Sequence, residues 1–329
     1  MGIKIIGTGR KLPKNTITNQ RLADYLDTTD DWITSKTGIK ARTICIEENL
    51  TDLAEEAVRI ALAKSGMEIS DIDMLICATM TGDYVMPSMA CCILERFDKS
   101  EVINCSAFDV NAACSGFIYA LDVADSFIMA NKANNILIVA AEMMSRMVDW
   151  DDRTSSILFG DGACACVISK VDSGNSLKYI RTVSDAQIGP LFTKSGRGNN
   201  PFIDESTGEK SSRPGYLQMQ GQQVYKFAVK VIEKEIQLAL FALNKVAEDI
   251  DYFILHQANT RIIDGARTRL KLPPEKFPIN IGQYGNMSAA SIPILLDEMI
   301  EDGRIQTGNL LMMIGFGAGM TAGTAVIEW

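Results

Sequence analysis

Two short sequence patterns each occur twice in this chain, in the same order and about half a chain apart. An Asp-Ile-Asp triplet followed by an apolar run occurs at 71–78 and again at 249–256. A Phe-Gly-x-Gly turn followed by an apolar run occurs at 159–168 and again at 316–327. Because repeats in the same order indicate a duplicated structural unit, the sequence predicts two similar halves.

The residues around these repeats favour an α/β fold in both halves. Apolar residues at helical spacing cover 53–65 and 224–243, and each of these runs directly precedes one of the Asp-Ile-Asp segments. Strand-like and helical runs alternate along the chain, as in α/β proteins. We therefore expect an N-terminal half over 1–172 and a C-terminal half over 173–329.

The segment that joins the two halves, 172–215, is rich in glycine, serine, asparagine and charged residues. Its most loop-like part is 195–201. A solvated connector and a mobile flap over a functional site both fit this composition, and the sequence leaves both open.

Composition excludes several classes of function. A net charge of −9 and a pI near 4.9 argue against a nucleic-acid binder. No apolar run approaches the roughly 20 residues of a membrane-spanning helix, and the N-terminus lacks a signal-peptide layout. The eight cysteines lack paired zinc-site spacing and the chain has one histidine, so we expect no metal, reduced thiols and a cytoplasmic location.

The first candidate catalytic residue is Cys114. It follows a strand-like run at 107–110 and precedes a helical run at 117–131, with small residues around it. This arrangement is typical of a nucleophile elbow, which presents its side chain outward, and a helix N-terminus would favour the reactive thiolate. The alternative is a structural thiol, because free cysteines are commonly buried.

Three further segments are expected near Cys114, because ligands of open α/β sheets gather at the carboxyl ends of strands. His256 ends the second Asp-Ile-Asp strand, and its polar and small neighbours favour an exposed site over a core position. The turn around Asn286 precedes a long helix and corresponds to Cys114 in the duplication. The turn at 317–319 could offer backbone N–H groups to an oxyanion.

Together these segments resemble β-ketoacyl-acyl-carrier-protein synthase III. The resemblance is carried by 112–117, 256–259, 285–293 and 316–319, and it extends from Ile5 to the C-terminus. It implies the duplicated thiolase fold, with two similar halves that each hold a mixed sheet between helix layers. It also implies a homodimeric enzyme that starts fatty-acid synthesis.

The resemblance assigns roles to the candidate catalytic residues. Cys114 would take an acyl group from acyl-CoA. His256 and Asn286 would hydrogen-bond the thioester carbonyl of malonyl-acyl-carrier protein and stabilise the enolate left by decarboxylation. Backbone N–H groups of Cys114 and Ala318 would hold the oxyanion. Acyl-CoA and malonyl-acyl-carrier protein are then substrates, and no permanently bound cofactor is expected.

The resemblance also suggests how coenzyme A and the primer bind. Trp32 and Arg153 match positions that sandwich adenine, and Asn259 matches a residue of the pantetheine tunnel. Lys36 stands where arginine is common, so we expect a weaker grip on phosphate because lysine lacks the planar guanidinium. Met86 stands where several acetyl-specific members have phenylalanine, and its flexibility predicts tolerance of longer primers.

Basic residues follow the His256 segment and also occur on the preceding helix. A mixed, solvated helix face would explain them, but two of them match docking positions for the acidic acyl carrier protein, and complementary charge would steer that encounter. The predicted docking residues are Lys226, Arg261, Arg267, Arg269 and Lys271.

Three alternatives to this function remain on sequence grounds. A starter or tailoring acyltransferase of secondary metabolism, of polyketide or quinolone type, would share the catalytic residues and use another acceptor. A cysteine hydrolase would use Cys, His and Asn in the same order, although the duplication opposes it. An inactive partner subunit would be expected to lack the cysteine, and Cys114 is present.

Overall fold

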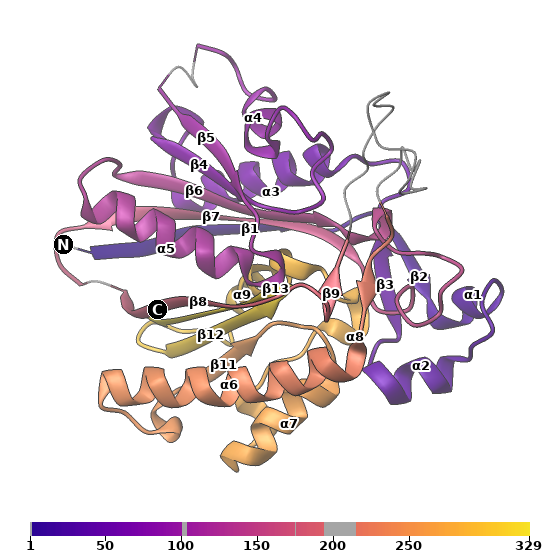
Figure 1. The fold of residues 1–329 in the computed structure, drawn as a ribbon. Helices are drawn as coiled ribbons and strands as arrows, with labels where there is room; N and C mark the ends of the chain where they lie inside the picture. Colours follow the sequence, from indigo (N-terminus) through magenta and orange to yellow (C-terminus); the bar gives the residue numbers. More distant parts are fainter. Residues whose placement is uncertain (1, 101–103, 175, 194–214) are drawn as a thin grey trace, which may run out of the picture.

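The computed structural model describes residues 2–329 except 101–103, 175 and 194–214. It has five layers, in which helices cover the outer face of each of two sheets and further helices separate them (Figure 1). The loop-like segment 195–201 lies outside the described residues.

The first sheet draws its five strands from the N-terminal part of the chain. Its order is β1 (Gly2–Lys11), β7 (Asp161–Val171), β6 (Asn135–Met143), β4 (Met74–Ala78) and β5 (Ser106–Val110). Strand β4 runs parallel to β5 and β6, whereas β7 is antiparallel to both of its neighbours. The sheet is therefore mixed, with β5 at one edge.

The second sheet repeats this order with four strands. It runs β8 (Leu177–Gln187), β13 (Gly319–Glu328), β12 (Leu310–Gly317) and β11 (Tyr252–Leu255). Here too one pair is parallel, β11 with β12, and the other pairs are antiparallel. The equivalence of β1-β7-β6-β4 with β8-β13-β12-β11 confirms the expected fold of two similar halves.

One expectation about the connector was wrong. Residues 177–187, which we assigned to it, form the edge strand β8 and pair with β13 over the length of that strand. The segment contains charged residues, but alternate side chains such as Tyr179 and Val183 pack on the core, which is the periodicity of a half-buried strand. The division of the chain at residue 172 stays a prediction.

The helices take equivalent places in the two halves. Helices α3 (Leu50–Ser65) and α4 (Met89–Leu94) cover the first sheet, and α6 (Gly221–Leu243) and α7 (Thr260–Leu270) cover the second (Figure 1). Helices α5 (Gly116–Met129) and α9 (Ser291–Glu301) lie between the sheets. The smaller elements are β2 (Asn15–Thr18), α1 (Asn19–Ala23), α2 (Asp30–Thr37), β3 (Ala41–Ile44), β9 (Leu191–Phe192), β10 (Gln218–Met219) and α8 (Ile281–Tyr284), with 3₁₀ turns η1 (Ile69–Asp71), η2 (Ala113–Ser115), η3 (Met144–Arg146), η5 (Ala247–Asp249), η6 (Pro274–Lys276) and η7 (Ser288–Ala290).

The layer between the sheets is the main hydrophobic core. Phe117, Leu121, Ile292 and Leu295 of the two central helices are almost fully buried, and side chains from both sheets pack on them. Because α5 and α9 are enclosed on both sides, the turns that start them, η2 and η7, are held rigidly side by side. Among the helices of the described residues, none has the length and apolar character needed to cross a membrane.

Candidate active site

A pocket of about 420 Å³ opens where elements of both halves meet. Cys114, His256 and Asn286 all line it, together with Gly317, the last residue of β12. Its remaining walls are mostly apolar, which is the usual character of a small-molecule site. The structure thus brings together the segments that the sequence placed at the ends of different strands. The apolar wall residues are Leu158, Phe159, Leu191, Met219, Val224, Ile262 and Phe316.

Cys114 lies on the sharp turn between β5 and α5, as its sequence context predicted. Ala113, directly before it, has a φ of 47°, a conformation that costs free energy in residues other than glycine. The turn is also tightly packed, because a Cβ on Gly317 would lie 2.7 Å from the backbone nitrogen of Cys114. The nucleophile is therefore fixed by backbone geometry.

Cys114 was expected to be an exposed thiolate, and the structure contradicts this expectation. Cys114 is only 5% exposed, and burial is the main cause that raises the pKa of its thiol to about 12. A hydrogen bond with the Ser288 hydroxyl lowers that pKa without overcoming the burial. Burial of a thiolate away from water would cost more free energy than the N-terminus of α5 contributes to stabilising it. The resting form is therefore the neutral thiol.

His256 is buried as well, which corrects the expectation that it occupies an exposed site. The residue is 1% exposed, its backbone N–H donates to Ile314 O at 2.9 Å, and its ring meets Phe316 edge to face at 5.3 Å. Burial lowers the pKa of His256 to about 3, so the imidazole is neutral at physiological pH. Its Nδ1 is buried and has no hydrogen-bond partner among the described residues.

Asn286 is oriented by the turn it starts. Its Oδ1 accepts a hydrogen bond from Ser288 N at 2.9 Å, and Ser288 has a φ of 48°. Its backbone is clamped to the first half, because Asn286 N donates to Leu158 O at 2.9 Å and Gly160 N donates to Asn286 O at 3.0 Å. With its oxygen occupied, the side chain has its NH₂ group left as a donor for a pocket ligand.

The rim of the pocket joins α2 to the start of α7. Asn259 caps α7 and donates from Nδ2 to Lys36 O at 3.1 Å, while Arg261 Nη2 donates to Ser35 O at 2.7 Å. Lys36, Asn259 and Arg261 all line the pocket. The rim is therefore cationic, whereas the interior is apolar and holds the neutral thiol and imidazole.

Trp32 and Arg153 lie close together outside the residues that line the pocket. The Arg153 guanidinium stacks over the Trp32 ring at 5.2 Å and donates from Nη1 to Asp27 O at 2.6 Å. In this arrangement no ring fits between them. The structure brings the pair together, and the stack closes the space that the resemblance assigns to adenine.

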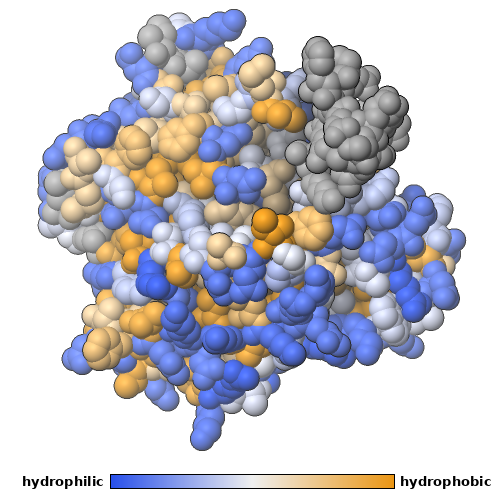
Figure 2. Space-filling model, in the orientation of Figure 1, coloured by the Kyte–Doolittle hydropathy of each residue, from blue (hydrophilic) through white to orange (hydrophobic). Residues whose placement is uncertain are grey.

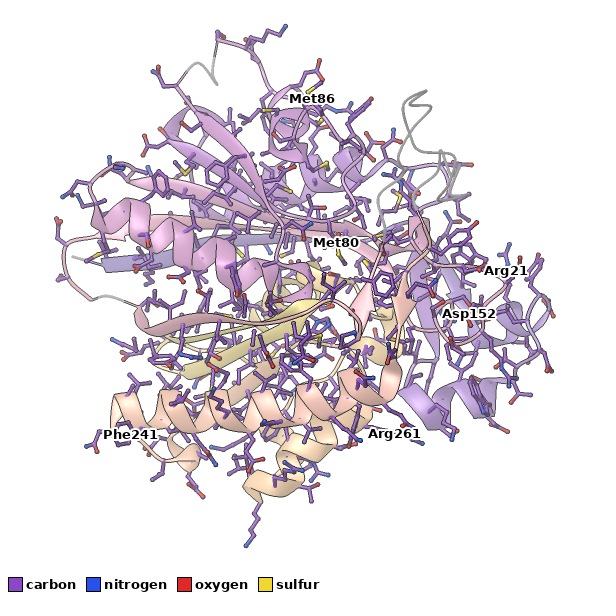
Figure 3. All side chains as sticks on the ribbon, viewed as in Figure 1. Arg21, Met80, Met86, Asp152, Phe241 and Arg261 are labelled. Atoms are coloured by element: carbon purple, nitrogen blue, oxygen red, sulfur yellow. The ribbon has the colours of Figure 1, made fainter. Side chains whose placement is uncertain are left out.

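The predicted acyl-pocket and docking residues lie elsewhere. Met86 is 86% exposed and does not line this pocket, and Figure 3 shows it far from Arg261. Arg267 pairs with Asp264 at 3.4 Å, and Arg269 pairs with Glu233 at 2.6 Å. Within the described residues, no carboxylate lies within ion-pair distance of the other three docking candidates, which are Lys226, Arg261 and Lys271.

Sequence reasoning missed two polar residues beside Cys114. Glu142 is the penultimate residue of β6 and has no exposed surface, and it accepts a hydrogen bond from Ser288 Oγ at 3.1 Å. A signal for Glu142 was present, because it is the one charged residue in the apolar run 136–144. No comparable signal marked Ser288, since serine is ordinary in a turn.

Two family models match the chain. The model for 3-oxoacyl-[acyl-carrier-protein (ACP)] synthase III matches residues 108–186, and the model for its C-terminal part matches residues 240–329. A β-ketoacyl-[acyl-carrier-protein] synthase III of Clostridium perfringens is 44% identical over 326 residues, which are 99% of this chain and 98% of that protein. The matched segments include every candidate catalytic residue.

Solved structures give the same result. A 3-oxoacyl-[acyl-carrier-protein] synthase III of Aquifex aeolicus superposes with a TM-score of 0.90 at 39% identity and covers both chains completely. The priming β-ketosynthase of the R1128 polyketide pathway also has a TM-score of 0.90, at 30% identity over 99% of this chain and 96% of its own. Fold similarity is thus equal for the two, whereas sequence identity is higher for the first.

Proposed function

The chain belongs to the β-ketoacyl-[acyl-carrier-protein] synthase III family, and from this premise we propose which of its residues do the chemistry. It is an acyltransferase that starts fatty-acid synthesis by condensation. An acyl-CoA primer acylates a cysteine, and decarboxylative condensation with malonyl-acyl-carrier protein then gives 3-oxoacyl-acyl-carrier protein, CoA and CO₂. The observation that carries the proposal is the shared pocket of Cys114, His256 and Asn286.

Cys114 is the nucleophile in this proposal. Its sulfur attacks the acyl-CoA carbonyl, CoA leaves, and a thioester on Cys114 remains. The backbone N–H groups of Cys114 and Ala318 then stabilise the oxyanion, and the close approach of Gly317 to Cys114 N supports this pairing of two turns. Because the first product leaves before the second substrate reacts, ping-pong kinetics are expected.

His256 and Asn286 act in the second half-reaction. Each donates a hydrogen bond to the thioester carbonyl of malonyl-acyl-carrier protein, and these bonds strengthen as decarboxylation places negative charge on that oxygen. The depressed pKa of His256 supports this role, because a neutral imidazole donates without the cost of burying a cation. The resulting carbanion attacks the acyl group on Cys114 and releases the thiol.

The cationic rim binds coenzyme A. Lys36 contacts its phosphates, and Asn259 lies along the pantetheine arm. For Trp32 and Arg153 to hold adenine, the Arg153 side chain must leave its stack and its bond to Asp27 O, so binding of coenzyme A opens this pair. The sequence departure at Lys36 predicts a weaker grip on phosphate than arginine would provide.

We further propose a homodimer in which Met86 reaches the partner's acyl pocket. Support comes from Tyr84, Val85 and Met86, which are all exposed, and from β5, which is an edge strand of the first sheet among the described residues. Figure 2 shows apolar residues gathered over β5 and α5, a surface that a second copy would cover. A flexible methionine at this place favours primers longer than acetyl.

The acidic carrier protein docks on the basic face beside the pocket rim. Lys226, Arg261 and Lys271 are the strongest candidates, because Arg267 and Arg269 are already paired with carboxylates. A cytoplasmic location is also proposed, with support from the eight free cysteines, which are typical of a reducing compartment.

One alternative function has a specific observation behind it. The polyketide priming synthase is as similar in fold as the fatty-acid enzyme, so a starter role in secondary metabolism would use the same residues. Higher identity to the fatty-acid enzymes over the whole chain favours fatty-acid synthesis. The hydrolase alternative lacks support from any of these relatives, and a peptidase assay checks it directly.

The test is intact mass spectrometry with a panel of acyl-CoAs, with Cys114→Ser alongside. We expect an acyl adduct on the wild type alone, discharged when malonyl-acyl-carrier protein is added. An adduct that this substrate does not discharge would favour another acceptor. No adduct with any acyl-CoA would refute the proposed roles.

A further inference from the structure

Glu142 is a buried carboxylate that the reaction described above does not use. Its Oε2 accepts hydrogen bonds from Thr81 Oγ1 and, at 3.3 Å, from Met80 N, and its Oε1 accepts one from Ser288 Oγ at 3.1 Å. These donors come from the loop after β4 and from η7, so one side chain connects both halves behind the pocket. Burying a carboxylate costs desolvation free energy that these hydrogen bonds offset only in part, so its presence here points to a role in specificity or function.

The Ser288 hydroxyl is shared between Glu142 and the nucleophile. It donates to Glu142 Oε1, and because η7 packs against η2 it also lies near enough to the Cys114 thiol to lower the pKa of that thiol. Ser288 is held in this position by its left-handed backbone and by the bond from its N–H to Asn286 Oδ1. A chain of thiol, hydroxyl and carboxylate thus joins the three residues.

The surroundings of Glu142 allow it to accept a proton at neutral pH. Burial is the main cause that raises its pKa to about 7, and neutral hydroxyl and N–H donors counter this only in part. The titratable groups that face it are thiols, Cys114 on η2 and Cys77 on β4, and burial raises the pKa of both. On the adjacent strand β7 its partner is Gly162, which carries no charge.

We propose that Glu142 positions Ser288 against the Cys114 thiol and holds the proton of that thiol while the acyl group is on sulfur. This inference rests on the proposed function, because it concerns the same nucleophile. Glu142 acts through Ser288 and does not touch the substrate.

In the first half-reaction the proton moves away from sulfur. The S–H bond of Cys114 breaks as its proton passes to Ser288 Oγ, and the Ser288 hydroxyl proton passes to the carboxylate of Glu142. The charge of −1 moves from Glu142 to sulfur, and the sulfur electron pair forms the bond to the acyl carbon. CoA leaves as a thiolate and takes one proton from solution.

In the second half-reaction the proton returns. The carbanion attacks the acyl carbon, the carbon–sulfur bond breaks, and its electron pair stays on Cys114. Glu142 then gives its proton back through Ser288, which restores the thiol and the carboxylate. One proton is consumed over the cycle, by CoA, so that the cycle is balanced.

The proposal predicts a particular dependence of thiol reactivity on pH. Above about pH 7 the thiol and the carboxylate share one proton, so the fraction present as thiolate with protonated Glu142 stays constant. Below that pH the pair takes up a second proton and the thiolate fraction falls. Without Glu142 the reaction depends on free thiolate alone, whose fraction rises about tenfold per pH unit up to the pKa of the thiol.

Alkylation by iodoacetamide, followed at the Cys114 peptide by mass spectrometry, tests this dependence between pH 6 and 9. We expect the wild-type rate to level off above about pH 7, where the carboxylate takes the thiol proton as sulfur attacks. Glu142→Gln lacks this base, so its rate should rise continuously with pH and be roughly a hundredfold slower at pH 7. Ser288→Ala, which keeps the carboxylate and breaks the chain, should behave like Glu142→Gln. It also serves as the test if Glu142→Gln does not fold.

Glu235→Gln is the control for loss of a buried carboxylate, because Glu235 is equally buried in the second half and accepts a hydrogen bond from Thr324 Oγ1 at 3.4 Å. Unlike Glu142, it is also ion-paired with Arg181. The Glu235→Gln variant should keep the wild-type plateau. A plateau that persists in both Glu142→Gln and Ser288→Ala, or its absence from the wild type, would overturn the proposal.

Infrared difference spectra give a second readout that a merely structural role would not change. The acyl-enzyme minus free-enzyme spectrum at pH 8 should gain a carboxylic-acid C=O band in the wild type and lack it in Glu142→Gln. A wild type that forms the acyl adduct without this band refutes the proton-holding role alone. A wild type that forms no adduct refutes the proposed function instead.

Discussion

The turns that start the two central helices have the same backbone and different chemistry. In η2, Asn111 Oδ1 accepts from Ala113 N at 3.3 Å, and Ala113 has a φ of 47°. In η7, Asn286 Oδ1 accepts from Ser288 N at 2.9 Å, and Ser288 has a φ of 48°. Each turn then leads directly into a helix enclosed between the two sheets.

The difference lies in which residue of each turn faces the pocket. In η2 it is Cys114, while Asn111 is exposed; in η7 it is Asn286, while Ala289, at the place of the cysteine, is buried against Gly116. The same strained turn therefore supplies a nucleophile in one half and a hydrogen-bond donor in the other. Duplication thus gave two rigid turns of the same backbone geometry. Their different side chains serve different half-reactions, acylation in the first turn and condensation in the second.

The largest effect should follow from loss of the nucleophile. Cys114→Ala should reduce condensation by at least about 10³-fold, because the covalent intermediate is lost. The equivalent change in the other turn, Ala289→Gly, should leave a measurable rate of acylation and mainly lower stability. Acyl-enzyme formation by intact mass distinguishes them, and an adduct on Cys114→Ala would show that another residue is acylated.

The next largest difference in activity should be between variants of Asn286 and Asn111, the asparagines of the two turns. Asn286→Ala removes a donor to the developing enolate, so we expect a loss of roughly 10²- to 10³-fold in condensation, with acylation by acyl-CoA little changed. Asn111→Ala removes a similar turn hydrogen bond away from the pocket and should cost about 1 kcal/mol in stability and little activity. Separate rates for the two half-reactions check this, and equal losses for both variants would refute the division of roles.

Glu142 and His256, which are buried titratable groups from different halves, should give opposite pH dependences of stability. The pKa of Glu142 is raised from 4.5 to about 7, so its contribution to the free energy of unfolding is lost as pH rises through this range. The pKa of His256 is lowered from 6.5 to about 3, so its contribution is lost as pH falls. Relative to the wild type, Glu142→Gln should gain about 2 kcal/mol between pH 5 and pH 6.5, and His256→Gln should lose about 2 kcal/mol over that range.

Urea unfolding of the three proteins at both pH values measures these slopes. Glu235→Gln again serves as a control for loss of a buried carboxylate. Parallel stability curves for all the variants would show that neither group keeps its charge state as described.

The smallest effect concerns the helices that are equivalent in the two halves, α4 and α7. Helix α4 has no basic residue in its last turn, whereas α7 carries Arg267 and Arg269 there and Arg261 in its first turn. Lys226→Glu and Arg261→Glu should each raise KM for malonyl-acyl-carrier protein about five- to tenfold, and more steeply at low salt. Because Arg261 also lines the pocket, Lys226→Glu is the cleaner test of docking.

Lys4→Glu on β1 makes the same change of charge far from this face and should leave KM unaltered. If acylation by acyl-CoA and use of the carrier protein weaken equally in Lys226→Glu, the docking role is wrong. Lys36→Arg tests the charge at the pocket rim that contacts coenzyme A. Because a guanidinium grips phosphate better than an ammonium, a modest decrease in KM for acyl-CoA is expected.

The sequence by itself determined the duplicated α/β plan and the segments that meet at the pocket. Repeated Asp-Ile-Asp and Phe-Gly-x-Gly patterns are local, and hydrophobic periodicity marks strands and helices without knowledge of their partners. Prediction from the sequence failed at β8, because a half-polar edge strand resembles a connector until its pairing with β13 is known. It also set Cys114, His256 and Asn286 at the ends of strands and turns, which topology brings together.

Only the tertiary structure decided the charge states at this site. Burial depends on what packs around a residue from distant parts of the chain, and it made the Cys114 thiol and the His256 ring neutral where their neighbours in sequence suggested exposure. The same burial gave Glu142 its raised pKa, and a turn 146 residues away supplied the Ser288 hydroxyl that it binds. Desolvation and long-range hydrogen bonds are properties of the fold, and no local pattern encodes them.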